Sequence, residues 1–145
     1  MKAYEIRVVR LNETPDAPQL NTPEDAFKYW QSVITAMPWY IADREVCVSI
    51  TLNTRLRVTG HSLVSIGTLD ESVAHCRDVF RAAVALNAYG IVLAHSHPSG
   101  ETSPSQADHT LTRRMQEAAR VLQINLVDHV IIGNQWFSFK EAGEL

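Results

Sequence analysis

The stretch IVLAHSHPSGETSPSQAD, from Ile91 to Asp108, decides the fold of this 145-residue chain. Its first part, Ile91 to His95, is a short and unbroken apolar run with β-branched residues at its start. Such a run predicts a central strand that is buried on both faces. A Pro-Ser-Gly loop follows, and the polar residues from Ser105 onward predict the start of a helix. We therefore expect a strand, a loop and a helix in this order.

The sequence around this stretch predicts further helices and strands in alternation. Apolar residues at helical spacing predict helices over 22–37, 68–90 and 105–124, the first with Thr22 as N-cap and the second closed by Gly90. Strands are expected over 4–10, 44–53, 56–67, 91–95, 125–133 and 135–139. In the strand after Arg44, alternation predicts that one face lies in the main core. The fold class is therefore α/β, with a mixed central sheet covered by helices.

Length and composition favour one structural unit with a substantial core. We expect residues 1–40 to form a strand and a helix that pack on a domain spanning residues 41–145. The chain is 46% hydrophobic and 20% charged, with a net charge of −3. This composition excludes a disordered or fibrous protein, and a broad nucleic-acid surface is not indicated, although a local patch stays open.

The same features bear on the cellular compartment. Two cysteines do not make a disulfide framework, the first residues lack the apolar core of a signal peptide, and no apolar run approaches the roughly 20 residues of a membrane span. We therefore expect a cytoplasmic protein without membrane contact. A homo-oligomer is left open.

The opening stretch carries residue types that bind metals. His95 and His97 are two residues apart at a strand end, so their side chains can point the same way. Asp108 follows in the first turn of the next helix, which the loop can fold back over the strand end. Two imidazoles and one carboxylate form a ligand set for Zn²⁺ that leaves a fourth position for water, as in catalytic zinc sites.

A metal-activated water needs a base, and that carboxylate must come from another part of the chain. We favour Glu45, because it lies where a strand begins and a rigid element would position it. Composition alone does not separate it from Glu71, Asp78 or Glu101.

The spacing of these residues also resembles a known family. His95-Ser96-His97, seven residues, Ser105, two residues and Asp108 match the pattern H-[ST]-H-x7-S-x-x-D of JAMM/MPN-plus metalloproteases. The text AHSHPSGETSPSQADHTLTRRMQEAARVLQINLVDHVIIG is similar to the RadC-like JAB domain, a family often labelled as DNA repair proteins. The similarity covers about residues 43–143.

This resemblance implies a JAB/MPN fold, related to that of the cytidine deaminases, and a set of roles. His95, His97 and Asp108 would bind zinc, Glu45 would activate water, and Ser105 would donate a hydrogen bond to the developing oxyanion. The chain departs from the family in having Ser96 in place of the usual Asn. Cys76-Arg77-Asp78 stands where the family has Pro-Arg-Glu. Residues 1–40 show no helix-hairpin-helix motif, so a short stand-alone member is expected.

Several residues in and near the pattern have more than one possible role. Ser105 and Asp108 also form a capping box, and both roles can hold together. His129 could orient a metal ligand from a neighbouring strand, or be a core histidine with a satisfied hydrogen bond. Ser96 is a weak candidate for a supporting or substrate-contacting residue. Cys47 is better explained as a small buried apolar residue than as a ligand.

Three functions from different classes follow from these residues. The first is a zinc-dependent hydrolase that cleaves an amide or isopeptide bond of an unidentified peptide or protein substrate. The second is a metal-dependent nuclease or DNA-repair factor, which the acidic net charge disfavours. The third is a non-catalytic MPN-like binding module. A zinc deaminase is disfavoured because the chain lacks a Pro-Cys-x-x-Cys pair.

Overall fold

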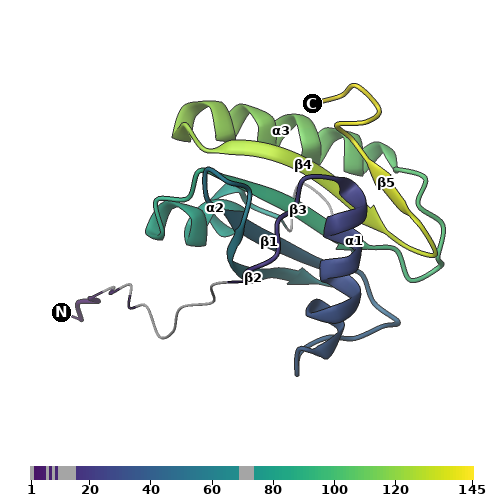
Figure 1. Cartoon of the computed structure of the whole chain (residues 1–145), viewed down its shortest axis with the longest axis horizontal. Helices are drawn as coiled ribbons and strands as arrows, with labels where there is room; N and C mark the ends of the chain where they lie inside the picture. Colours follow the sequence, from purple (N-terminus) through teal and green to yellow (C-terminus); the bar gives the residue numbers. More distant parts are fainter. Residues whose placement is uncertain (1, 6, 8, 10–15, 69–73) are drawn as a thin grey trace.

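One mixed sheet of five strands, in the order β2-β1-β3-β4-β5, forms the centre of the molecule. The computed structural model describes residues 2–5, 7, 9, 16–68 and 74–145. The strands are β1 (Val46–Leu52), β2 (Val58–Ile66), β3 (Gly90–Ser96), β4 (Asn125–Ile132) and β5 (Trp136–Ser138). β3 pairs in parallel with β4 and antiparallel with β1, so the sheet is mixed. Figure 1 shows β3 in the middle, as the apolar run predicted.

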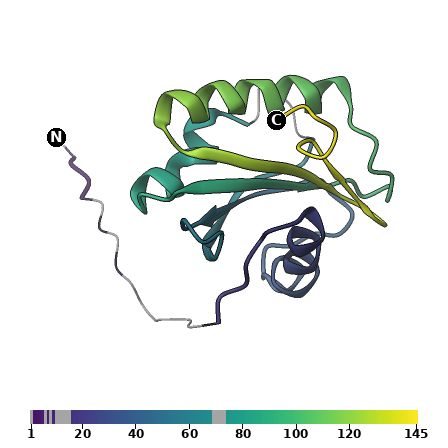
Figure 2. The same ribbon diagram turned by 45° about the horizontal axis from the view of Figure 1, so that its top comes forward.

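Helices cover both faces of this sheet. α1 (Pro23–Ser32) lies on one face, and α2 (Cys76–Ala85) and α3 (Gln106–Leu122) lie on the other (Figure 2). Each face has its own apolar cluster, one built around Trp30 and Ile50 and one around Phe80 and Leu93. The predicted α/β class with a helix-covered mixed sheet is therefore confirmed.

Strand β1 is more buried than its alternating sequence predicted. All seven of its residues are buried, so the face expected to lie outside the main core is covered as well. α2 packs on that second face, where Cys47 belongs to the apolar cluster. In β1, the alternating apolar and small polar residues therefore face two different buried clusters, one on each side of the sheet, and neither face is exposed to solvent.

The first helix begins as its sequence predicts and ends earlier. Thr22 is the N-cap, its hydroxyl accepts from the Asp25 N–H, and the Asp25 carboxylate accepts from the Thr22 N–H in return. Pro23 fills the first helical position, where no N–H is required. The α-helix ends at Ser32 and continues only as a 3₁₀ turn, η1 (Ile34–Ala36).

The helix expected over residues 68–90 is shorter in the structure. α2 begins at Cys76 and ends at Ala85, and residues 69–73 lie outside the described part of the chain. After the end of α2, Asn87 has a φ of 48° and so adopts the left-handed conformation that we expected at Gly90 from the sequence. Gly90 instead opens β3, where an added Cβ would lie 2.8 Å from the Asn125 carbonyl oxygen.

The strand predicted over residues 4–10 is wrong for its described residues. Tyr4, Glu5, Arg7 and Val9 belong to no strand, and the other three positions lie outside the described residues. Tyr4 is 93% exposed and Val9 is 67% exposed, so neither of these two described residues contributes to the core. The helices of the described ranges are all too short or too polar to cross a membrane.

Candidate metal centre

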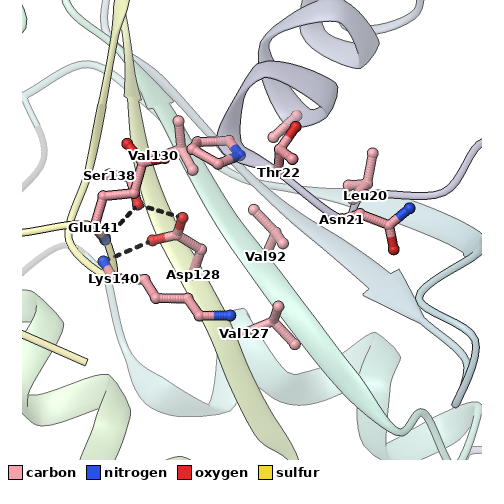
Figure 3. Close-up of a pocket in the computed structure, with 12 residues that line it drawn as sticks. Leu20, Asn21, Thr22, Val92, Val127, Asp128, Val130, Ser138, Lys140 and Glu141 are labelled. Atoms are coloured by element: carbon pink, nitrogen blue, oxygen red, sulfur yellow. Dashed lines mark hydrogen bonds between the residues drawn. The ribbon is translucent and has the colours of Figure 1, made fainter. Parts of the chain in front are cut away.

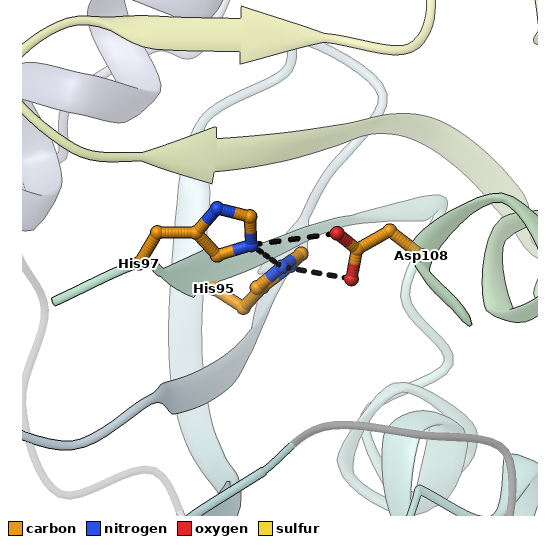
Figure 4. A group of neighbouring side chains, drawn as sticks. All are labelled: His95, His97 and Asp108. Atoms are coloured by element: carbon orange, nitrogen blue, oxygen red, sulfur yellow. Dashed lines mark hydrogen bonds and ion pairs between the residues drawn. The ribbon is translucent and has the colours of Figure 1, made fainter. Parts of the chain in front are cut away.

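The structure brings His95, His97 and Asp108 together at the end of β3 that leads into α3. Each offers one ligand atom, and the three atoms lie within 4.8 Å of one another. His95 comes from the buried end of β3, His97 from the loop after it, and Asp108 from the first turn of α3 (Figure 4). A strand end, a loop and a helix start therefore converge on one point.

The facing atoms are two imidazole nitrogens and two carboxylate oxygens. His95 Nε2 lies 3.0 Å from His97 Nε2 and 3.2 Å from Asp108 Oδ1. His97 Nε2 lies 3.4 Å from Asp108 Oδ2. The His95 side chain is fully buried, and the His97 side chain is 13% exposed. The cluster is thus open to solvent on the His97 side.

The loop fixes which nitrogen of His97 faces the cluster. His97 Nδ1 lies 2.9 Å from the carbonyl oxygen of Glu101. Because a carbonyl can only accept, Nδ1 carries the proton, and the lone pair of neutral His97 is on Nε2. This is the arrangement of a metal-binding histidine whose other nitrogen is held by a backbone carbonyl.

The charges of the cluster reinforce one another. Burial opposes ionisation of Asp108, but His95 and His97 donate to its carboxylate when their rings are protonated at Nε2, and this holds the pKa of the carboxyl well below the usual range. The hydrogen bond to Asp108 raises the pKa of His97, with smaller contributions that include the negative charge of Glu45. The site therefore presents a fixed negative charge that favours a cation.

The distances among these atoms leave room for one metal ion, and zinc provides a reference for their size. Bonds of about 2.1 Å in tetrahedral geometry place neighbouring ligand atoms about 3.4 Å apart. The two nitrogens are 3.0 Å apart, and each lies 3.2 or 3.4 Å from a different oxygen of the Asp108 carboxylate, so these separations are close to that value. Two nitrogens and one carboxylate oxygen are also a donor set that zinc accepts while keeping a fourth position for water.

Ser105 caps α3 and holds Asp108 in place. Its hydroxyl accepts from the Asp108 N–H at 3.1 Å, and its own N–H donates to Asp108 Oδ2 at 2.8 Å. The capping box inferred from the sequence is thus present, on the same carboxylate that faces the two histidines. Accepting this bond leaves the hydroxyl proton of Ser105 free to donate elsewhere.

Glu45 lies immediately before β1, at the sheet end that carries the cluster. Its carbonyl accepts from the Gly67 N–H. Burial is the largest cause of the raised pKa of the Cys47 thiol, and the negative charge of Glu45 adds to it. The same charge makes a smaller contribution to the raised pKa of His97, after the hydrogen bond to Asp108. Ser96 supports the same strand end, because its hydroxyl accepts from the Val46 N–H at 3.0 Å. Ser96 thus contacts the backbone next to Glu45.

His129 lies directly behind the cluster, on β4. Its Nε2 is 2.8 Å from His95 Nδ1, and its ring stacks on Phe139 with a centroid distance of 4.7 Å. Its Nδ1 lies 2.6 Å from the hydroxyl of Thr112, a residue that the sequence patterns did not identify. The available signal was spacing, because Thr112 follows Asp108 by four residues and so shares its helix face.

A separate cavity of about 300 Å³ lies on the opposite face of the sheet, beside α1 (Figure 3). Val92, Val127 and Val130 contribute apolar side chains to its lining, and Asp128 lines it as well. Burial raises the pKa of Asp128, although its carboxylate accepts from Ser138 and from two backbone N–H groups. The three residues of the metal cluster do not line this cavity.

Comparison with known proteins gives a consistent result. A family model described as RadC-like JAB domain matches residues 20–144. A UPF0758 protein of Thermotoga maritima is 41% identical over 88% of this chain, and one of Rubrobacter xylanophilus is 37% identical over 96%. These matches cover 55% and 59% of the relatives, so the chain spans little more than half of their length.

Proposed function

The chain belongs to the RadC-like JAB domain family, and we propose that it is a zinc-dependent hydrolase of amide or isopeptide bonds. The observation that carries this proposal is the convergence of His95, His97 and Asp108 at separations that suit tetrahedral zinc. Zinc bound there would lower the pKa of a water molecule and polarise a substrate carbonyl.

The residues around the cluster supply the remaining roles. Glu45 would accept a proton from the attacking water and deliver it to the leaving nitrogen. The Ser105 hydroxyl would donate to the oxygen that gains negative charge in the transition state. The partial exposure of His97 supports access of a peptide or protein substrate from that side. Free thiols at Cys47 and Cys76 support a reducing compartment, and we place the enzyme in the cytoplasm.

The first test is metal content, measured by mass spectrometry on protein prepared without added metal. We expect about one zinc per chain in wild type and in Glu45→Gln, and almost none in Asp108→Asn. Protein that takes up no zinc from micromolar solution would refute the proposed function.

The second test is turnover on peptide libraries, with cleavage products identified by mass spectrometry. Glu45→Gln should lose about 10²- to 10⁴-fold in rate, the range for removal of a general base. Glu101→Gln is the matched control. Glu101 is exposed and contacts His97 through its backbone carbonyl, which the substitution leaves in place, so turnover should be unchanged. Zinc-loaded protein that cleaves DNA but no peptide would replace the proposal with a nuclease. Zinc-loaded protein that cleaves neither would favour a binding module.

A further inference from the structure

A buried chain of polar groups runs from one member of the metal cluster to the backbone of another. His95 Nδ1 contacts His129 Nε2 at 2.8 Å, and His129 Nδ1 contacts the Thr112 hydroxyl at 2.6 Å. The Thr112 hydroxyl then reaches the Asp108 carbonyl oxygen at 2.8 Å. His129 is fully buried and Thr112 is 1% exposed, so water does not compete for these contacts.

The chemistry of the end group gives this chain one direction. The Asp108 carbonyl can only accept, so the single hydroxyl proton of Thr112 is donated to it. The Thr112 oxygen must then accept from His129, which places a proton on His129 Nδ1. A neutral His129 has its lone pair on Nε2 and accepts from His95 Nδ1. His95 therefore keeps its lone pair on Nε2, the atom that faces the cluster.

We propose that Thr112 and His129 are positioning residues that select the metal-binding tautomer of His95. This role rests on the proposed metal site, and it concerns how that site is prepared rather than what it cleaves. Without the Thr112 hydroxyl, a proton on His129 Nε2 would become acceptable. His129 would then donate to His95 Nδ1, and the proton of His95 would lie on the nitrogen that must bind zinc.

The two histidines of the cluster are thus oriented by different means. A loop carbonyl fixes His97, and a side-chain relay through the protein interior fixes His95. The stack on Phe139, with an interplanar angle of 9°, holds the plane of the His129 ring, and the contacts at its two nitrogens hold its orientation within that plane. In this orientation the position of its proton is the variable, and Thr112 determines that position.

A purely local role for Thr112 is the competing hypothesis. Helical threonines often donate to the carbonyl four residues earlier, as Thr112 does. That bond alone would make Thr112 a helix residue with no bearing on metal. The same oxygen, however, is the acceptor for a fully buried imidazole nitrogen, and valine, similar in shape to threonine, cannot replace it.

The test compares Thr112→Val with Thr112→Ser and with Thr110→Val as a matched control on the same helix. The Thr110 hydroxyl accepts a long contact of 3.3 Å from the exposed Arg113 and lies outside the relay. Zinc affinity is measured by competition with a chromophoric chelator. Thr112→Val should weaken it about 10- to 100-fold, the usual effect of losing a partner behind a ligand. Thr112→Ser and Thr110→Val should stay within about twofold of wild type on that same scale.

Nitrogen chemical shifts of the histidines give a readout that a structural role would not move. Long-range ¹H–¹⁵N spectra of metal-free wild type should show His129 protonated on Nδ1 with a bare Nε2. In Thr112→Val the His129 proton should move partly to Nε2, while Thr112→Ser should restore the wild-type pattern.

Two results would overturn the proposal. One is a folded Thr112→Val with the zinc affinity of Thr110→Val. The other is wild-type His129 with its proton on Nε2, which decides the matter even if Thr112→Val does not fold. Zinc-loaded wild type without hydrolytic activity would refute only the proposed function, because metal affinity and proton position are measured without turnover.

Discussion

Replacement of Gly133 by alanine is expected to damage the metal centre from a position outside it. Gly133 follows β4, and its backbone lies against the loop that carries His97. An alanine Cβ would lie 2.3 Å from the Gly100 carbonyl oxygen and 2.8 Å from the Thr102 methyl group. Side-chain carbons essentially never approach closer than 3.0 Å, so the loop must retreat by about 0.7 Å.

That movement would act on the bonds that shape the loop. The Gly100 carbonyl accepts from the Asn134 N–H at 2.9 Å, and the His97 N–H donates to the Ile132 carbonyl at 2.8 Å. Overpacking of this kind costs about 1–3 kcal/mol of unfolding free energy. Displacement of the Glu101 carbonyl would also release His97 Nδ1, which should weaken zinc binding about tenfold or more.

Urea unfolding and chelator competition measure the two effects, with Gly60→Ala as control. An added Cβ at Gly60 lies 3.5 Å from Thr51 Oγ1, an ordinary contact. Alanine there should leave zinc affinity unchanged and alter stability by less than about 1 kcal/mol. The reasoning is refuted if Gly133→Ala matches Gly60→Ala in both measurements.

Three further outcomes follow from single contacts. Ser105→Ala should lower the unfolding free energy by about 1 kcal/mol in urea titrations, because the cap on the Asp108 N–H is lost; an unchanged midpoint would contradict this. Zinc at a hundredfold its dissociation constant should raise that free energy by about 2.7 kcal/mol in wild type, and calorimetry should detect no increase in Asp108→Asn. Burial raises the pKa of Tyr29 to about 12. The unfolded chain therefore loses this proton first, and stability should fall as pH rises from about 10 to 12; the fall should be smaller in Tyr29→Phe, and equal falls would rule out this cause.

The elements that sequence predicted best are those whose pattern has one physical cause. The apolar run 91–94 has no polar face to present to solvent, which favoured a central strand that is buried on both faces. The predicted N-cap at Thr22 and the predicted capping box at Ser105 are local, since they involve backbone and side chains within three residues. Such signals do not depend on what the rest of the chain does.

The failures lie where a distant segment decides the outcome. The second face of β1 is buried because α2 packs there, and no property of residues 46–52 reveals that partner. Gly90 was expected to end a helix, but its backbone instead lies against Asn125 in a strand. A glycine is compatible with both arrangements, so sequence alone could not choose between them.

The candidate site divides in the same way. The approach of His95 to His97 was predicted from the alternation of side chains at a strand end. The approach of Asp108 was predicted from its place in the first turn of the next helix. The contact of His129 with Thr112 could not be predicted, because it joins β4 to α3, and the sequence does not show how this helix packs on this strand. The spacing of four residues places Thr112 on the same helix face as Asp108. The contact of Thr112 with His129 arises only because that face packs on β4.

Each member of the cluster is held by an element that the fold needs for other reasons. Asp108 caps α3 through Oδ2, which leaves Oδ1 to face His95. His95 occupies the buried end of the central strand, and His97 anchors the loop between strand and helix through Glu101. Assembly of the cluster is therefore coupled to folding of the first turn of α3. A carboxylate and two imidazole lone pairs held at 3.0–3.4 Å repel one another unless a cation or a proton lies between them. The architecture that places them so close thus favours a positive charge at this point, from a metal ion or a proton, before any substrate is considered.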